Sequence, residues 1–136
     1  MTVMTIARLA QSAGIGVETV RFYQRKGLLR TPDRPWTGGQ GGGVRTYDED
    51  DAKRLRFIRS AQAAGFTLAQ IGRLLDLDRT ADRPAIRDLA ESRVAALDVQ
   101  IRDLTAARAA LAKLARECGG GTKGPCPIIE AFDSGL

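Results

Sequence analysis

The chain contains no histidine, only two cysteines, and no apolar run near the roughly 18 residues that a membrane-spanning helix requires. Without histidine, a phosphate-binding glycine motif or a nucleophile placed beside a base, the sequence offers no acid–base machinery, so we do not expect an enzyme. The N-terminus also lacks the basic-then-apolar pattern of a secretion signal. These absences predict a cytoplasmic protein without a membrane, whose two cysteines are thiols or metal ligands rather than a structural disulfide.

Charge is distributed unevenly along the 136 residues, which suffice for one small domain and an appended helix. Residues 1–75 contain 12 Lys and Arg against six Asp and Glu, whereas residues 76–136 contain nine against ten. The first part therefore has the positive potential that contacts to nucleic-acid phosphates use.

Residues 5–29 combine two short helical patterns with a glycine turn, which is the layout of a helix–turn–helix DNA reader. Thr5 is a candidate N-cap, and Gly14 can take the positive φ that the turn needs. A helical hairpin with a solvated basic face is the alternative interpretation. The side chains left to face DNA bases or phosphates are Thr19, Arg21, Tyr23, Gln24, Arg25 and Lys26.

Residues 30–43 contain two prolines and five glycines, which exclude regular structure over most of this segment. An extended piece follows at residues 44–47, and strand alternation places Arg45 and Tyr47 on one face. A loop closed by such a strand is typical of a winged helix–turn–helix. A surface linker that ends in a strand is the alternative.

Two further helices are predicted to repeat the helix–turn–helix arrangement. Asp48 starts the first with acidic residues that suit the helix dipole, and Thr67 caps the second. Lys53 and Arg54 are predicted to face outward or towards phosphate. We expect the two helical pairs to share one core through Phe22, Leu28, Phe57 and Phe66.

From Ala85 to Glu117 no glycine or proline occurs, which allows a helix of about 34 residues and about 50 Å from Pro84 onwards. Apolar residues recur along it at alternating spacings of four and three, with Arg108 as the one break. Such a stripe needs a partner helix, so we predict a two-stranded coiled coil of two copies rather than a rod folded back on its own domain. The stripe consists of Ala90, Val94, Leu97, Ile101, Leu104, Leu111, Ala115 and Cys118.

Seven residues, GGGTKGP, separate Cys118 from Cys126, and such a loop can bring both sulfurs around one ion. Thiolates select soft ions such as Cu(I), Hg(II) or Zn(II), and a four-ligand zinc site would need ligands from elsewhere. Two sulfurs alone suit the linear coordination of Cu(I), Ag(I), Au(I) and, in many settings, Hg(II). A redox pair that forms a disulfide and two inert thiols are the alternatives.

Taken together, the motifs resemble the MerR family of transcription regulators over nearly the full length. The carrying segments are VETVRFYQRKGLL at 17–29, GVRTY at 43–47, RLRFIRSAQAAGFTLAQIGRLL at 54–75, the long helix, and CGGGTKGPCPII at 118–129.

The resemblance implies a mainly α fold, in which a winged helix–turn–helix domain precedes a long dimerisation helix that forms an antiparallel coiled coil. The implied divisions are 1–76 for DNA binding, 77–117 for linker and coiled coil, and 118–136 for metal-binding loop and tail. It also implies a homodimer on double-stranded promoter DNA, whose effector-bound form bends and untwists that promoter so that RNA polymerase can read it.

By that resemblance Arg21 and Tyr23 lie on the recognition helix and Arg45 and Tyr47 on the wing. Lys53, Arg54 and Arg56 are weaker candidates for contacts to the DNA backbone. The wing departs from the family pattern through its glycine-rich insertion, residues 38–42.

The metal-sensing branch of the family places a third cysteine at the start of the long helix in sensors of mercury, zinc, lead and cadmium, and a serine in copper sensors. Here the matching position is Arg83, with Asp82 beside it as a second candidate near the metal. The missing thiolate and the Pro127-Ile128-Ile129 sequence favour Cu(I), Ag(I) or Au(I), with Hg(II) as the alternative. Arg83 either neutralises a bis-thiolate centre or is solvated, and we favour solvation because buried Arg is normally paired.

Overall fold

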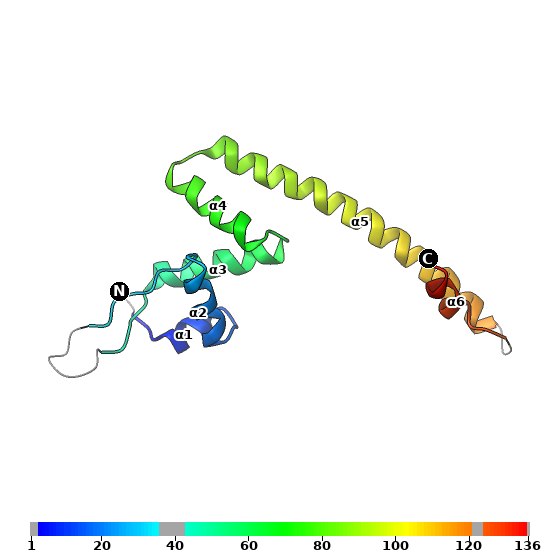
Figure 1. Cartoon of the computed structure of the whole chain (residues 1–136), viewed down its shortest axis with the longest axis horizontal. Helices are drawn as coiled ribbons and strands as arrows, with labels where there is room; N and C mark the ends of the chain where they lie inside the picture. The colour runs from blue at the N-terminus through cyan, green and yellow to red at the C-terminus, as the bar shows by residue number, and fades with distance from the viewer. Residues whose placement is uncertain (1–2, 36–42, 121–123, 136) are drawn as a thin grey trace. The chain divides into compact units, whose positions relative to one another are not determined.

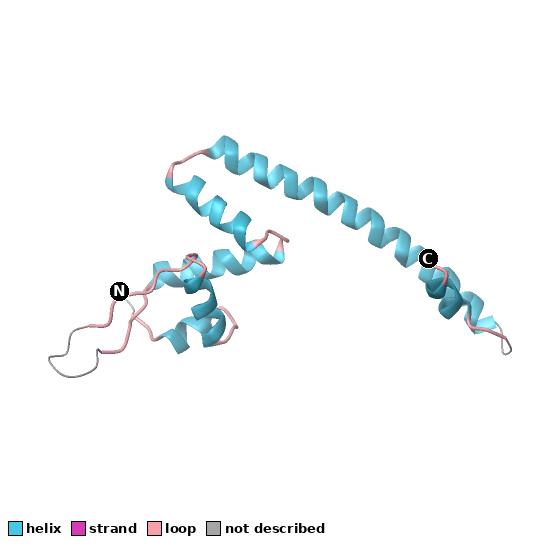
Figure 2. Cartoon of the chain, viewed as in Figure 1, coloured by secondary structure: helices cyan, strands magenta, loops and turns pink. Residues whose placement is uncertain are grey.

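The computed structural model describes residues 3–35, 43–120 and 124–135, and within them it contains six helices joined by turns and loops (Figures 1 and 2). The chain forms two compact units, residues 1–89 and 90–136, with the division inside the longest helix. The predicted mainly α fold is confirmed. The helices are α1 (Ile6–Ser12), α2 (Val17–Arg25), α3 (Glu49–Ala63), α4 (Leu68–Arg79), α5 (Arg83–Gly120) and α6 (Pro127–Asp133).

Side-chain caps start the helices of the first unit where the sequence predicts them. The Thr5 hydroxyl accepts a hydrogen bond from the backbone N–H of Arg8 at 3.2 Å. Thr67 and Gln70 form a reciprocal capping box on α4, with hydrogen bonds of 3.1 and 2.9 Å. Gly14 turns the chain between α1 and α2 with φ at +68°, a conformation that glycine adopts without a steric penalty.

Asp51 is a buried carboxylate with every oxygen in use, and it ties the start of α3 to the segment after α2. Its side chain accepts from the backbone N–H of Asp48 at 2.9 Å in a second capping box. Arg30 donates to both of its oxygens, with Nε–Oδ1 at 2.7 Å and Nη2–Oδ2 at 2.6 Å. A bidentate pair of this kind compensates the desolvation of the carboxylate, so the pair holds the end of the helix–turn–helix against α3.

The core of the first unit lies where α1 packs against α2 and α3, and α3 against α4. It confirms that both helical pairs share one core. Its fully or almost fully buried apolar side chains are Leu9, Ala10, Val20, Tyr23, Leu28, Leu29, Tyr47, Ala52, Leu55, Ile58, Ala61 and Ile71.

The aromatic residues are distributed differently from the prediction. Phe22 is 36% and Phe57 39% exposed, whereas Tyr23, expected to face DNA, is 2% exposed. Tyr23 follows Val20 by three residues and so continues the inward face of α2, where its hydroxyl donates to Gln62 Oε1 at 2.5 Å. A tyrosine can join the core because a partner satisfies its hydroxyl, and the prediction of an outward Tyr23 is wrong.

The extended piece after the proline- and glycine-rich segment is anchored at both ends. Met4 and Tyr47 form an antiparallel bridge with two N–O distances of 2.8 Å, and the Gly43 N–H donates to the Pro35 carbonyl at 2.9 Å. Among the described residues this bridge is the only β-type pairing. The glycine-rich insertion at 38–42 lies outside the described residues.

Helix α5 contains 38 residues and extends two residues beyond Cys118, so the first two glycines after Cys118 continue it. None of its described residues is buried, and the predicted seam stays open in the single chain, with Ile101 61% and Leu104 62% exposed. At its start, the Asp82 carboxylate accepts from the backbone N–H of Ala85 at 3.2 Å. Among the described residues no helix combines the length and hydrophobicity of a bilayer-spanning segment.

Candidate DNA interface and metal centre

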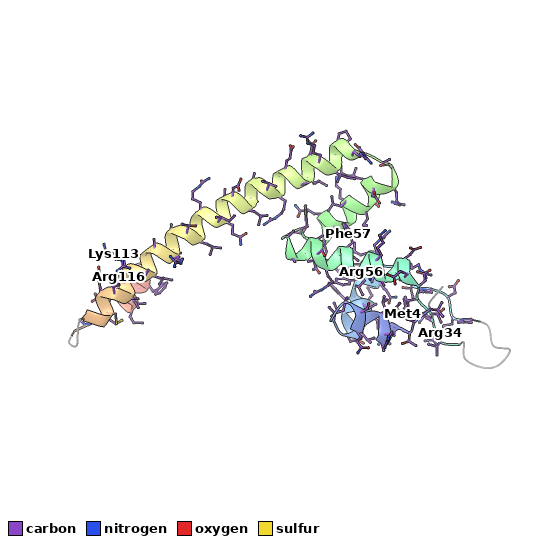
Figure 3. The ribbon with its side chains drawn as sticks, turned by 180° about the vertical axis from the view of Figure 1, so that it is seen from behind. Met4, Arg34, Arg56, Phe57, Lys113 and Arg116 are labelled. Carbon is purple, nitrogen blue, oxygen red and sulfur yellow. The ribbon has the colours of Figure 1, made fainter. Side chains whose placement is uncertain are left out.

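Three arginines line a pocket of about 320 Å³ between α2 and the segments on either side of the loop. Arg21 comes from α2, Arg34 from the segment that leads into the loop (Figure 3), and Arg45 from the extended piece after it. Among the described residues that line this pocket, none is acidic. Guanidinium groups match phosphate oxygens through paired N–H donors, so the pocket has the chemistry of a DNA-backbone contact.

The structure thus brings together two predicted arginines, Arg21 and Arg45, and adds Arg34, which sequence reasoning missed. The pocket is also lined by Gln24 and Tyr47, which were predicted to face DNA. Arg21 pairs with Glu18 at 2.7 Å, but both side chains are more than half exposed. Exposed pairs contribute little free energy, so Arg21 can exchange Glu18 for a phosphate at small cost. No sequence pattern indicates Arg34, because the proline- and glycine-rich segment that contains it has no helical or strand periodicity.

Arg45 is held in place from two sides. Its Nε donates to the Pro32 carbonyl at 2.8 Å. Its neighbour Tyr47, 2% exposed, accepts from Gln24 Nε2 at 2.9 Å, and the same amide lies 3.2 Å from the Arg30 carbonyl. Gln24 therefore fastens the extended piece to α2, and Tyr47, predicted as a DNA contact, is buried as part of this support.

The other predicted DNA contacts do not line this pocket. Arg25 and Lys26 are exposed near the end of α2, and Thr19 is half-buried. The ammonium of Lys26 lies 5.6 Å from the centroid of the exposed Phe22 ring, a cation–π contact that orients it. Phe22 was predicted to lie in the core, but its ring is instead exposed beside Lys26.

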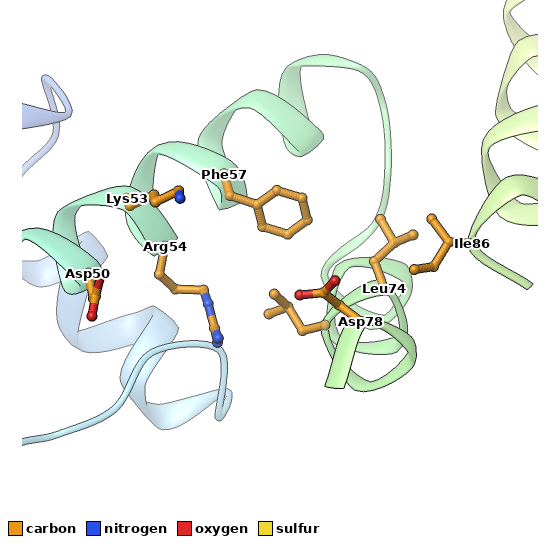
Figure 4. Close-up of a pocket in the computed structure, with 8 residues that line it drawn as sticks. Asp50, Lys53, Arg54, Phe57, Leu74, Asp78 and Ile86 are labelled. Atoms are coloured by element: carbon orange, nitrogen blue, oxygen red, sulfur yellow. The ribbon is translucent and has the colours of Figure 1, made fainter. Parts of the chain in front are cut away.

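Lys53 and Arg54 are exposed on α3, and they line a different pocket, of about 620 Å³ (Figure 4). Its apolar wall explains the exposure of Phe57, whose ring faces this space instead of the core. The remaining lining residues are Asp50, Leu74, Leu75, Asp78 and Ile86.

In the second unit, the structure brings together the two cysteines. The Cys118 and Cys126 sulfurs are 3.4 Å apart and unbonded, and both residues are half-buried. Cys118 lies near the end of α5, while Cys126 is the N-cap of α6 and is followed by Pro127 in the first turn. Gly124 takes φ of +93° just before it, a value that side-chain-bearing residues rarely adopt.

Hydrogen bonding makes the two thiols unequal. The backbone N–H of Ile129, then the Cys118 side chain and the N–H of Ile128, lower the pKa of the Cys126 thiol. The hydrogen bond to Cys126, together with its charge, raises the pKa of Cys118. As pH rises, Cys126 is therefore the first of the pair to lose its proton, and Cys118 the second. A thiolate is the form of cysteine that binds metal.

Asp82 and Arg83 are both exposed, and the Asp82 carboxylate caps α5. Among the described residues no three Cys, Asp or Glu side chains gather as a metal site. Within one described chain the donor set is therefore the sulfur pair.

Two family models match the chain and overlap in α3 and α4. The model for the MerR HTH family regulatory protein matches residues 4–78, and the model described as MerR, DNA binding matches residues 52–114. The mercuric resistance operon regulatory protein of Shigella flexneri is 41% identical over 131 residues, which are 95% of this chain and 87% of that protein.

Two solved structures resemble the fold over nearly the whole chain. The transcription regulator PbrR691 from Ralstonia metallidurans CH34, in complex with lead(II), has a TM-score of 0.69 and 32% identity, covering 95% of this chain and 98% of its own. The regulator MerR from Bacillus megaterium MB1, in complex with mercury(II), has a TM-score of 0.62 and 29% identity over the same shares.

Proposed function

Since the chain belongs to the MerR family of DNA-binding transcription regulators, we propose that it controls a promoter in response to a soft metal ion held by Cys118 and Cys126. The observation that carries this proposal is the 3.4 Å approach of the two sulfurs. Relatives that respond to mercury or bind lead support a metal as the signal. Because the family consists of transcription regulators, the expectation that the chain is not an enzyme is confirmed.

The donor set favours a monovalent ion, Cu(I), Ag(I) or Au(I). Two thiolates satisfy the linear coordination of these soft ions without a third ligand. The position where the mercury- and lead-sensing branch has a third cysteine is occupied by Arg83, whose side chain cannot donate an electron pair to a metal. Cys118 and Cys126 would hold the ion, and the chain's own backbone orients their sulfurs.

Hg(II) is the second candidate, and the relatives favour it. The Shigella flexneri regulator carries mercuric resistance in its name, and the Bacillus megaterium structure contains mercury(II). Hg(II) also accepts two thiolates in linear coordination. The two candidates share the cysteine pair and differ in which ion the promoter responds to.

On the DNA side, Arg21, Arg34 and Arg45 contact backbone phosphates in this proposal. Further DNA contacts come from Thr19, Arg25, Lys26, Lys53 and Arg54. The buried Tyr23 and Tyr47 support this DNA-binding surface from the core. A homodimer joined by an antiparallel α5 coiled coil places two such surfaces on one double-stranded promoter in the cytoplasm. Metal binding then bends and untwists the promoter DNA so that RNA polymerase can read it.

In vitro transcription with the purified protein at buffered free-metal concentrations tests the identity of the ion. We expect Cu(I) and Ag(I) to raise transcription at free concentrations where Zn(II) and Pb(II) have no effect. A response to Hg(II) alone would select the second candidate. Activation by oxidant without metal binding would contradict both.

Metal affinity should rise by about one log unit per pH unit between the pKa of Cys126 and that of Cys118. Binding needs two thiolates, and Cys126 with its lowered pKa loses its proton before Cys118, so in that interval about one proton, that of Cys118, is released. The slope should increase to about two below the pKa of Cys126 and vanish above that of Cys118. Chelator competition from about pH 6 to 9 measures it. A slope that falls directly from two to zero, with no interval of one, would show that the thiols are equivalent.

A further inference from the structure

A third cavity of the first unit, about 470 Å³, is lined mainly by cationic and small side chains. It lies between the turn after α2, the middle of α3 and the second half of α4. Its cations are Lys26, Arg30, Arg54 and Arg79, and Asp76 is the one acidic residue that lines it. The lining therefore contains four cations and one anion, and Arg30 is also paired with Asp51 outside the lining.

Contacts to the surrounding structure hold three of these cations in place. Arg54 reaches from α3 to the turn after α2, where its Nη1 lies 3.4 Å from the Leu28 carbonyl (Figure 4). Arg79 Nη2 lies 2.5 Å from Asp76 Oδ1, one turn earlier on α4. Arg30 is fixed by the bidentate pair described above. The positive charges are thus placed before any ligand arrives.

Two of the four cations, Lys26 and Arg54, pair with no carboxylate among the described residues. We propose that this pocket binds a phosphate-bearing anion, with Lys26, Arg54 and Arg79 as its donors. Charge-assisted hydrogen bonds from guanidinium and ammonium groups are the usual means by which proteins hold phosphate. The volume lies within the range of roughly 300–1,000 Å³ typical of small-ligand sites.

The phosphate group has two potential sources that share this chemistry. Lys26 directly follows α2, so a DNA-backbone phosphate beside the recognition helix is one source. A free phosphorylated molecule is the other, and Leu28 and Leu75 in the lining would contact its apolar part. The site contains neither cysteine, so its test does not depend on the metal response.

Calorimetric titration of the full-length, reduced protein with inorganic pyrophosphate at constant ionic strength tests the site. We expect a saturable site whose affinity is weakened about tenfold or more in Arg79→Gln and in Lys26→Gln. Arg73→Gln is the matched control, because it removes the same charge from an exposed position of α4 outside the pocket. It should bind within about twofold of wild type.

Absence of saturable binding, or an equal loss in Arg73→Gln, would overturn the proposal. Circular dichroism of each variant shows whether a loss of binding comes from unfolding. If Arg79→Gln unfolds, the test depends on Lys26→Gln, because Lys26 is exposed at the end of α2.

A second arm repeats the titration on protein saturated with a duplex selected from random sequence for tight binding. Pyrophosphate that still binds identifies a free anion as the ligand. If bound DNA excludes pyrophosphate, the ligand is a backbone phosphate. The slope of log DNA affinity against log salt concentration should then be about 0.9 shallower in Arg79→Gln than in wild type.

Discussion

Cys126→Ser is expected to lower the affinity for Cu(I) by at least about 10²-fold and to abolish metal-dependent transcription. A structural zinc site with four ligands binds with about 10–16 kcal/mol, so each ligand contributes about 3 kcal/mol. In a two-sulfur site no remaining ligand compensates for the loss. Serine has nearly the same size as cysteine, but its hydroxyl is not a thiolate. Competition with a chromophoric Cu(I) chelator measures the affinity.

Cys118→Ser should have the same effect on affinity, since both sulfurs bind the same ion. Ser134→Ala is the control on α6, because the Ser134 hydroxyl bonds only to backbone carbonyls of its own helix. Its metal affinity and transcription should match wild type. If either cysteine variant kept its affinity within threefold, the ion would be bound elsewhere.

The double substitution Ile101→Asp with Leu104→Asp is expected to convert the dimer to a monomer. These side chains are 61% and 62% exposed in the single chain and lie three residues apart on the predicted seam. Both residues are present in each copy, so the double substitution removes four buried apolar side chains from the interface. The loss costs about 1.5–3 kcal/mol of association free energy for each side chain. The total weakens association by at least about 10⁴-fold.

Sedimentation equilibrium at micromolar concentration separates the two states. Val99→Asp is the matched control: Val99 is 49% exposed on the same helix but lies off the seam. This variant should stay dimeric. The double variant should also bind its promoter weakly, because two half-sites are no longer linked. A double variant that remained dimeric would refute the coiled coil.

The helices could be predicted from the sequence because their signals are local. Thr5 and Thr67 cap their helices as expected, and Gly14 takes the positive φ that its turn requires. A cap and a turn depend on residues within about four positions of each other. The predicted seam of α5 is likewise a pattern of local spacing, and four of its members, Val94, Ile101, Leu104 and Leu111, are exposed in the single chain.

The candidate sites could be predicted only in part. Arg21 and Arg45, each predicted as a DNA contact, line one pocket, but Arg34, which also lines it, lies in a segment without periodicity. The neighbours Tyr23 and Phe22 differ in burial, since Tyr23 is buried and Phe22 is exposed. Only the rotation of α2 about its axis relative to α3 determines which of the two rings reaches Gln62. Asp82, considered near the metal, has its carboxylate on the backbone of Ala85.

By itself the sequence determined the helical elements, the basic first part, the family resemblance and the pair of cysteines, because each depends on neighbouring residues or on composition. The tertiary structure decided which aromatic rings are buried, which arginines share a pocket and which of the two thiols has the lower pKa. These outcomes depend on groups brought together through space: Asp51 with Arg30, Gln24 with Tyr47, and the Ile129 N–H with Cys126. The spacing of residues along the chain contains no record of these distances.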